Sequence, residues 1–489
     1  MITCSAFRWF RPALVSSAAV LGMAALAGCS LSPRYVRPAA VVPEQLNSTT
    51  VSPTNGARCS ERMRGEDIGF VRATVKGGQL DTMINAALCR SPDYRLAELN
   101  VRLARAQAGQ SNSARLPRLD GQIVKSKQRF GDPALDERYQ QDLSMATVGL
   151  SEFDPDFFGR LRSLAAADGL RWEASQHGRD AARGALIGET LRAYVLYSAA
   201  KEAEAQAGVV ASSAREQLRL AERRQALGMI ASDDLRDAES LAAQADANAA
   251  KAAEASKAQE RALRFLVGFD SALPKPNLSL FVDGSGDAVR YGGLDSSVLY
   301  QRPEVLEAEA QLQAAHADIG AARAAFFPSI QLTTSLGSAS ESLGGLFSAS
   351  KAWTFTPSLR LPIFDFGRNK QALDLAWIRQ KQGVVQYEKA VQRAFVDVAD
   401  ALGSRSQAEQ AYTAARKKEL AAVGKTGRLI QRIDAGLQDA MDRPQAEIDA
   451  ANATADRVAA QQDFALSRIA LSHAFYATAP ARPSPSDSH

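Results

Sequence analysis

Side chains that could carry out chemistry are few in this chain and lie far apart. Its four histidines show no metal-binding spacing. They are His177, His316, His473 and His489. The segment Gly424-Lys425-Thr426 ends like a phosphate-binding loop, but Glu419 stands where that loop requires its first glycine. A Gly-x-Ser-x-Gly nucleophile motif is absent from the sequence. The sequence therefore predicts a protein that is not an enzyme, with no catalytic residue, no metal site and no cofactor.

One cysteine does have a defined chemistry. Arg8 and Arg11 precede an apolar run from Ala13 to Ala27, the pattern of a secretory signal peptide. The run ends in Leu26-Ala27-Gly28-Cys29, which resembles the bacterial lipobox, whose cysteine sulfur carries a diacylglycerol. We therefore expect a lipoprotein signal peptide over residues 1–28 and a lipid anchor at Cys29. Ser30 stands where an Asp would hold such lipoproteins in the inner membrane, so delivery to the outer membrane is expected.

The remaining cysteines suggest one disulfide. Cys4 leaves with the signal peptide and Cys29 carries lipid, so Cys59 and Cys89 are left as a pair in an oxidising compartment. We predict that they are bridged, while two unrelated buried thiols are the alternative.

Charge and composition limit the partners. Lys plus Arg number 58 and Asp plus Glu 54, so the net charge of +4 over 489 residues gives no electrostatic footprint for nucleic acid. Beyond the signal peptide, no stretch approaches the roughly 20 apolar residues of a membrane-spanning helix. Any further contact with a membrane must use strands, lipid or partner proteins.

The body of the chain is one unit written twice. Ser91-Pro92-Asp93 corresponds to Arg302-Pro303-Glu304, and Phe158-Gly159-Arg160 corresponds to Phe366-Gly367-Arg368. Farther along each copy, Gly228 corresponds to Gly436. We assign six segments: the signal peptide at 1–28, the lipid anchor and N-terminal tether at 29–79, a first repeat at 80–270, a linker at 271–293, a second repeat at 294–478 and a disordered tail at 479–489.

Within each repeat, the spacing of the apolar residues changes from a helical pattern to the alternation typical of strands. Apolar and polar residues alternate from Ile330 to Leu336 and from Trp353 to Ile363, which predicts strands, and the first copy follows the same pattern less clearly. We place the strands at about 118–155 and 328–364. Two proline-poor runs follow, Arg160 to Leu227 and Arg368 to Ala435, and each is roughly 100 Å long as a helix. A glycine turn and a returning helix complete each copy.

Four strands are too few to close into a barrel. An open strand edge in lipid leaves backbone N–H and C=O groups unpaired, at a cost on the order of several kcal/mol for each group. The predicted fold is therefore mainly α with a small transmembrane β part, and other copies must complete the strands. Alternation in the strands argues against a purely structural helical lipoprotein. Duplicated strand pairs argue against a periplasmic adaptor, which would have a single helical hairpin.

Several segments resemble the lipoprotein, NodT-like branch of the outer membrane efflux proteins. The most specific are Ile319 to Ile330, Leu361 to Arg368 and Tyr387 to Leu402. The resemblance implies a homotrimer with a twelve-stranded β-barrel in the outer membrane and a long α-helical barrel in the periplasm. It also implies a periplasmic adaptor and an inner membrane pump of the resistance-nodulation-division type. The expected function is the exit duct of a tripartite pump for drugs or other small solutes; a channel for type I protein or polysaccharide secretion is the alternative.

The same resemblance directs attention to the two hairpin tips, Gly228 and Gly436, where such tunnels close. Charged residues gather there, and in a threefold ring any acid that faces the lumen would repeat as a ring of negative charge. The alternative is that these acids only favour helix N-termini through the helix dipole. Candidate gate residues are Asp233, Asp234, Asp237, Arg432, Asp434, Asp439, Met441, Asp442 and Arg443. Ser232 is expected to cap the returning helix of the first tip.

Overall fold

The computed structural model describes residues 32–37, 61–269, 271–281, 295–342 and 350–476. The chain divides into two compact units, Met1–Gly56 and Ala57–His489. Residues 32–37 of the first unit form neither helix nor strand. All helices and strands that the structure describes lie in the second unit.

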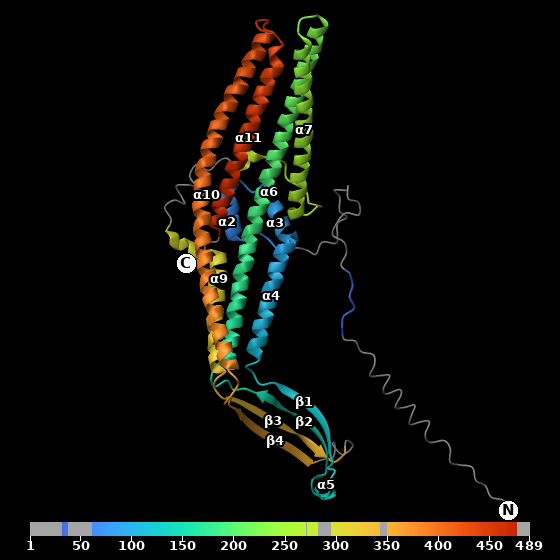
Figure 1. The fold of residues 1–489 in the computed structure, drawn as a ribbon, viewed down its shortest axis with the longest axis vertical. Coiled ribbons are helices and arrows are strands. Elements are labelled where there is room, and N and C mark those ends of the chain that lie inside the picture. Colours follow the sequence, from blue (N-terminus) through green and yellow to red (C-terminus); the bar gives the residue numbers. More distant parts are fainter. Residues whose placement is uncertain (1–31, 38–60, 270, 282–294, 343–349, 477–489) are drawn as a thin grey trace, which may run out of the picture. The chain divides into compact units, whose positions relative to one another are not determined.

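The second unit repeats one order of elements, as the sequence predicts (Figure 1). The first copy comprises α4 (Pro92–Ser113), β1 (Leu119–Gln128), β2 (Gln141–Phe153), α6 (Arg160–Ala226) and α7 (Ser232–Val267). The second comprises α9 (Pro303–Ala324), β3 (Ser329–Ser340), β4 (Ser350–Arg360), α10 (Arg368–Asp434) and α11 (Asp442–Ala474). The ends of the two long helices, α6 and α10, lie within one residue of their predicted positions.

Backbone details at corresponding positions are the same in the two copies. Pro92 and Pro303 open α4 and α9, where a missing N–H costs nothing. At the tips, Gly228 and Gly436 both have a φ of 71°, a left-handed value that suits glycine. The next amide bonds back to the helix in both, from Met229 to the Arg224 carbonyl and from Leu437 to the Arg432 carbonyl, at 2.8 Å each. Both hairpins thus turn through the same helix-ending motif.

Short elements are present in addition to the predicted helices and strands of the repeats. They are α2 (Gly65–Thr74), α3 (Asp81–Arg90), α5 (Pro133–Tyr139), and the 3-10 helices η1 (Leu278–Phe281) and η2 (Ser296–Gln301). Part of the range assigned to the anchor and tether, residues 29–79, is folded, because α2 is a helix that buries Phe70 and Val71. The predicted linker likewise contributes η1 to the core, where Phe281 is fully buried.

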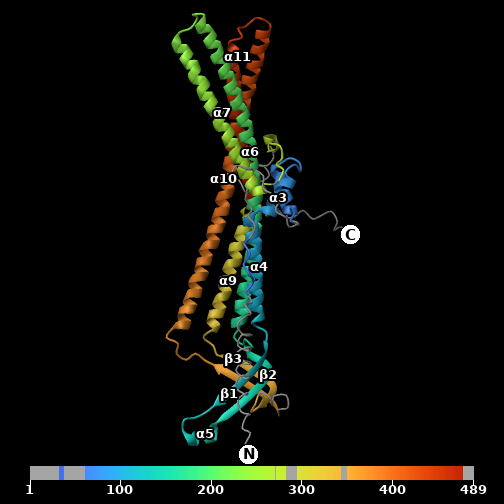
Figure 2. The same cartoon turned by 90° about the vertical axis from the view of Figure 1, so that its right-hand side faces the viewer.

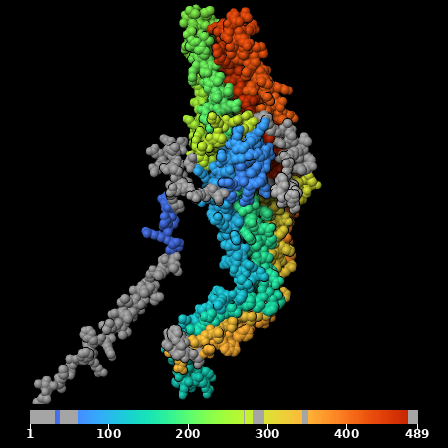
Figure 3. Space-filling view, turned by 180° about the vertical axis from the view of Figure 1, so that it is seen from behind, coloured from blue at the N-terminus to red at the C-terminus, as the bar shows by residue number. Residues whose placement is uncertain are grey.

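The main core lies midway along the long helices, where α2 and α3 (blue in Figure 3) gather on one side of them. Its apolar part joins Ile84 and Leu88 of α3 to Leu191 of α6, Leu263 of α7 and Ile469 of α11. At its centre is a polar network around Arg183, which is wholly buried. The region that binds the two repeats together is therefore assembled from residues far apart in the sequence.

A four-stranded antiparallel sheet of order β1-β2-β3-β4 lies at the end of the helices opposite the tips (Figures 1 and 2). The register pairs Val148 with Leu336 and Leu336 with Trp353, so these apolar residues share one face. Alternate positions form the other, polar face, where the hydroxyls of Ser335 and Thr354 lie 2.7 Å apart. None of the described helices is both long and apolar enough to cross a membrane.

Helices pack in two overlapping rows. On the sheet side the row is α4, α6, α9, α10, and on the tip side it is α7, α6, α11, α10. Both long helices belong to both rows (Figure 2). Sheet-side and tip-side rows each have two open ends, and so does the sheet, whose outer strands are β1 and β4.

Candidate functional site: the open edges and the hairpin tips

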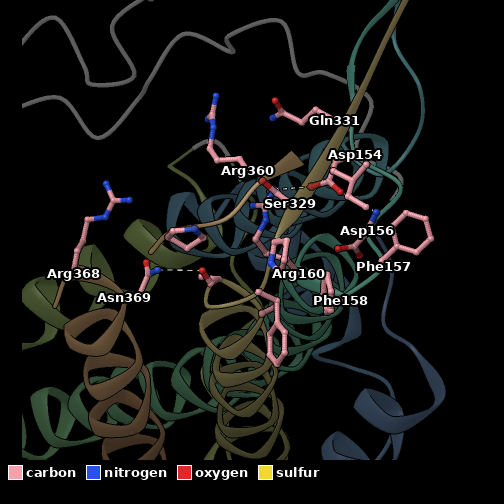
Figure 4. A pocket seen from close by; sticks show the side chains of 16 residues that line it. Asp154, Asp156, Phe157, Phe158, Arg160, Ser329, Gln331, Arg360, Arg368 and Asn369 are labelled. Atoms are coloured by element: carbon pink, nitrogen blue, oxygen red, sulfur yellow. Dashed lines mark hydrogen bonds and ion pairs between the residues drawn. The ribbon is translucent and has the colours of Figure 1, made fainter. Parts of the chain in front are cut away.

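A cavity of about 390 Å³ lies where the strands meet the helices (Figure 4). Two of its polar side chains, Asp156 and Asn369, hold the backbone. Asp156 accepts the amides of Leu161 and Arg162 at 2.9 and 2.7 Å, which caps α6. Asn369 donates its side-chain amide to the Ala325 carbonyl at 3.1 Å. This cavity is therefore a structural joint between strands and helices, with Phe158 stacked on Phe327 at 4.9 Å across it.

No group of three potential metal ligands is present among the described residues. His177 and His316 lie on α6 and α9, and His473 is partly buried near the end of α11. Lys425 lies well inside α10 and does not follow a strand, which rules out a phosphate-binding loop there. The features left to carry function are the exposed edges and the tips.

On the sheet side, both open helical edges carry exposed apolar side chains. On α4, Leu96, Leu99 and Leu103 follow a helical spacing and each is more than half exposed. On α10, Ile378 and Val385 lie two turns apart on one face and are also more than half exposed. Exposed apolar stripes of this kind are typical of surfaces that pack against another protein.

Apolar residues of α10 step by three and four positions, which is the spacing of a coiled-coil seam, and they fall into two groups. Tyr387, Val391 and Val398 pack inside the chain, in a cluster with Leu299 and Val305. Leu420 and Val423, nearer the tip, are 63% and 50% exposed. Their pattern predicts a packed seam, so their exposure in the single chain again indicates a missing neighbour.

At the first tip, the predicted gate acids bond locally. Asp233 pairs with Arg236 one turn away, while Asp234 accepts the Ala231 amide at 3.1 Å. The N-cap of α7 is Ala231 rather than Ser232, because Asp234 reaches back and serves that amide itself. Asp237 is exposed and has no ion pair among the described residues.

At the second tip, two predicted acids also serve their own turn. Asp439 accepts the Met441 amide at 3.0 Å, and Asp442 accepts the side-chain amide of Gln438 at 2.6 Å. Met441 is the N-cap of α11, and Pro444 fits the first turn because no helical bond needs its N–H there. Arg432 and Asp434 are exposed in the last turn of α10.

Of the candidates at the described tips, only Arg443 joins the two hairpins, and it does so through Glu447. Arg443 donates to Glu447 at 2.8 Å, and the other oxygen of Glu447 accepts the Ser213 hydroxyl of α6 at 2.9 Å. The Glu447 carboxylate raises the pKa of Arg443. Gln217 of α6 donates to Gln445 of α11 at 3.2 Å, one turn along. These two contacts between hairpins were missed by the sequence reasoning, although the Arg443 to Glu447 spacing is that of a helical ion pair.

The cysteine predictions are tested only in part. Cys29 and Cys59 lie outside the described residues. Cys89 lies in α3 and is disulfide-bonded, with its partner outside the described residues. Its sulfur lies 3.6 Å from the Glu61 carbonyl oxygen. The chain just after Cys59 therefore runs beside Cys89.

The chain resembles known proteins over most of its length. The sequence model described as "Outer membrane efflux protein" matches residues 83–269 and 294–475. The cation efflux system protein CusC of Escherichia coli (strain K12) is 34% identical over 396 residues, which cover 80% of this chain and 84% of CusC. The solvent efflux pump outer membrane protein SrpC of Pseudomonas putida is 35% identical over 390 residues, 78% of this chain and 80% of SrpC.

A solved channel structure also resembles this chain. The open state of the MtrE outer membrane channel of Neisseria gonorrhoeae superimposes with a TM-score of 0.71 at 33% identity, covering 91% of this chain and 98% of MtrE.

Proposed function

Because the chain belongs to the outer membrane efflux protein family, we propose that three copies close through their open edges into one duct across the outer membrane and into the periplasm. The protein is the outer membrane channel of an efflux pump. The sheet order and both helical rows support the threefold arrangement, because all three end at open edges on the same two sides of the chain. Three copies give twelve strands and twelve helices at each level.

The edges match in character. On the sheet side, α4 of one copy would meet α10 of the next, and both carry exposed apolar stripes whose burial is worth about 25 cal/mol per Å². In the sheet, β1 would pair with β4 of the next copy, which satisfies backbone groups that cannot stay open in lipid. Closure of three copies into one ring thus pairs the open edges of the sheet and of both helical rows.

The strands are suited to an outer membrane. On the apolar face, Leu359 lies toward the helices and Trp353 toward the far end, both well exposed. Beyond Leu359, Phe364 and Phe366 are 76% and 90% exposed, with ring centroids 4.5 Å apart. Aromatic residues at both ends of an apolar band are typical of strands that cross this membrane. Cys29 would add a lipid anchor in the same membrane.

We further propose that the tips form the gate. On the tip side, α7 of one copy meets α10 of the next. Asp237 lies in the second turn of α7, and Arg428 lies in the second turn from the end of α10; both are exposed and without an ion pair in the described part of the chain. Contacts of this kind between copies, with the Arg443–Glu447–Ser213 link inside each copy, would hold the tunnel closed. A preference of a few kcal/mol is enough to keep it more than 99% closed.

The remaining partners follow from this geometry. Among the described elements of the second unit, only the tips are far enough from the sheet to reach a periplasmic adaptor and an inner membrane pump, of the resistance-nodulation-division type by resemblance. We propose no catalytic step in the duct. The name of CusC refers to cation efflux and the name of SrpC to solvent efflux, so relatives with similar identity to this chain differ in the compounds that they export. Selection among drugs, solvents and cations is therefore assigned to the pump.

Native mass spectrometry of the protein extracted from outer membranes in mild detergent tests the assembly. We expect a mass of three chains, each carrying lipid at Cys29. A stable single chain would contradict the closure, and an unmodified N-terminus would contradict the anchor. Deletion of the gene should leave cells more sensitive to the pump's substrates, and the intact gene should restore resistance.

A further inference from the structure

The apolar face of the sheet ends in lysines, and only on its two outer strands. Register and alternation place Lys125 and Lys127 of β1 on the same face as Ile123. Lys351 of β4 lies on that face too, two residues beyond Trp353 and ~7 Å farther from the helices. On the inner strands, the facing positions at this end are Ser144, Asp142 and Ser338.

These lysines are exposed and have no ion pair within the described ranges. The one carboxylate on that face at this end, Asp142, is already engaged by Arg129 at 3.1 Å. Asp142 lies opposite Lys127 in the strand register, so the ammonium groups left without a carboxylate partner among the residues that the structure describes are those of Lys125 and Lys351.

Their position next to the apolar band fixes their depth in a membrane. Ile123, Trp353 and Phe355 are 74%, 74% and 59% exposed and form the band's outer end. A lysine at the middle of a lipid-facing strand costs about 2–4 kcal/mol, but close to the interface the cost falls to about 0–1 kcal/mol. With the helices in the periplasm, Lys125, Lys127 and Lys351 lie at the headgroups of the outer leaflet.

Closure of the ring brings the two sets together. The edge strand β1 of one copy pairs with β4 of the next, so the lysines of two copies meet at each of three seams and at no other strand pair. Like charges across a strand pair are destabilising. A bound anion at headgroup depth would remove that repulsion.

From this juxtaposition we propose that each seam binds the phosphate groups of the phosphorylated glycolipid of the outer leaflet, through Lys125 and Lys127 of one copy and Lys351 of the next. The site rests on the proposed function, since it needs the strands in the outer membrane and exists only in the assembled ring. The bound lipid then acts as a clamp across the seam.

Trimers purified in detergent and freed of native lipid test the site. The probes are bisphosphorylated lipid A, the same lipid A with both phosphates removed, phosphatidylglycerol and inorganic phosphate. Readouts are the temperature at which the trimer dissociates and the number of bound lipids in native mass spectra. Bisphosphorylated lipid A should raise the dissociation temperature and bind at up to three copies per trimer.

The variant Lys125→Gln/Lys351→Gln should lose this stabilisation and bind at least about tenfold more weakly, as expected for the loss of charge-assisted contacts. The control Lys370→Gln removes an exposed lysine near the start of α10, away from the outer end of the sheet, and should behave as the natural protein.

Equal stabilisation by dephosphorylated lipid A, by phosphatidylglycerol or by inorganic phosphate would overturn the proposal, and so would unchanged binding in the strand variant. Trimers that form and conduct but ignore lipid A would refute this site alone. Failure to form trimers at all would refute the proposed function with it.

Discussion

Arg183 and Asp67 form an ion pair of 2.8 Å in which both side chains are wholly buried, although 116 residues separate them. Arg183 also donates to the Tyr94 hydroxyl at 2.8 Å, and the Tyr476 hydroxyl donates to Asp67 at 2.8 Å. Burial and the Asp67 carboxylate raise the pKa of Tyr476, so its hydroxyl keeps its proton. One network thus fastens α2, α4, α6 and the end of α11, close to the midpoint of the long helices.

Replacing one partner of this pair should be costly. Arg183→Met leaves the Asp67 carboxylate buried without its counter-charge, for which we expect a loss of about 3–5 kcal/mol. The control Arg179→Met breaks a partly exposed pair with Asp180 and should cost about 0–1 kcal/mol. Chemical denaturation of the detergent-solubilised protein measures both. Equal losses of unfolding free energy in the two variants would show that the buried network stabilises the fold no more than a partly exposed ion pair does.

A second prediction concerns close packing of β2 on β3. A Cβ added at Gly149 would lie 1.8 Å from the Thr334 carbonyl oxygen, whereas at Gly121 in β1 its nearest contact would be 4.0 Å away. Gly149→Val should therefore force the strands apart and deplete heat-resistant trimers in outer membrane fractions. Gly121→Val is the control and should assemble. If both variants assemble equally well, the close approach at Gly149 does not limit assembly.

Acid should weaken the mid-helix core through His473. Burial lowers the pKa of His473, so the folded state binds fewer protons than the unfolded state once the pH falls below about 6.5. Stability is then fully present at higher pH and declines as the pH falls from about 6.5 toward the lowered pKa. Thermal unfolding at mildly acidic and neutral pH should show this dependence in the natural protein. In His473→Gln the dependence should shrink, and in His316→Gln it should remain.

The disulfide prediction can be settled by labelling thiols. We expect no free thiol at Cys59 and Cys89 when the denatured protein is labelled without reductant, because the chain next to Cys59 runs beside Cys89. The bridge should add about 2–4 kcal/mol by constraining the unfolded chain. Cys59→Ser/Cys89→Ser should lower the stability by that amount. Two labelled thiols would rule the bridge out.

Local signals in the sequence were enough to predict the repeat, the ends of α6 and α10, and the glycine turns at the tips. Glycine, proline and helical or strand periodicity determine those features over a few residues. The fold of α2 was not predictable in this way, since Glu66, Asp67 and Arg72 make it look polar and solvent-exposed. Its burial depends on Arg183, which arrives from α6 after both strands of the first copy.

The same division applies to the candidate site. Charge at the tips could be recognised from sequence, and so could the position of each turn. Which acids bond within their own turn, as Asp234 and Asp439 do, depends on side-chain direction. Glu447 and Ser213 join the hairpins only because α11 packs on α6, a contact between helices of different repeats.

The most direct test of the gated duct is the single-channel conductance of purified trimers in a planar bilayer. Arg443→Ala/Glu447→Ala removes the link between the hairpins, and Glu239→Ala on the exposed face of α7 is the control. We predict low conductance for the natural protein and the control, and a severalfold rise for the double variant with the trimer intact. Intact trimers of the double variant that conduct no more than the natural protein would contradict a gate at the hairpin tips.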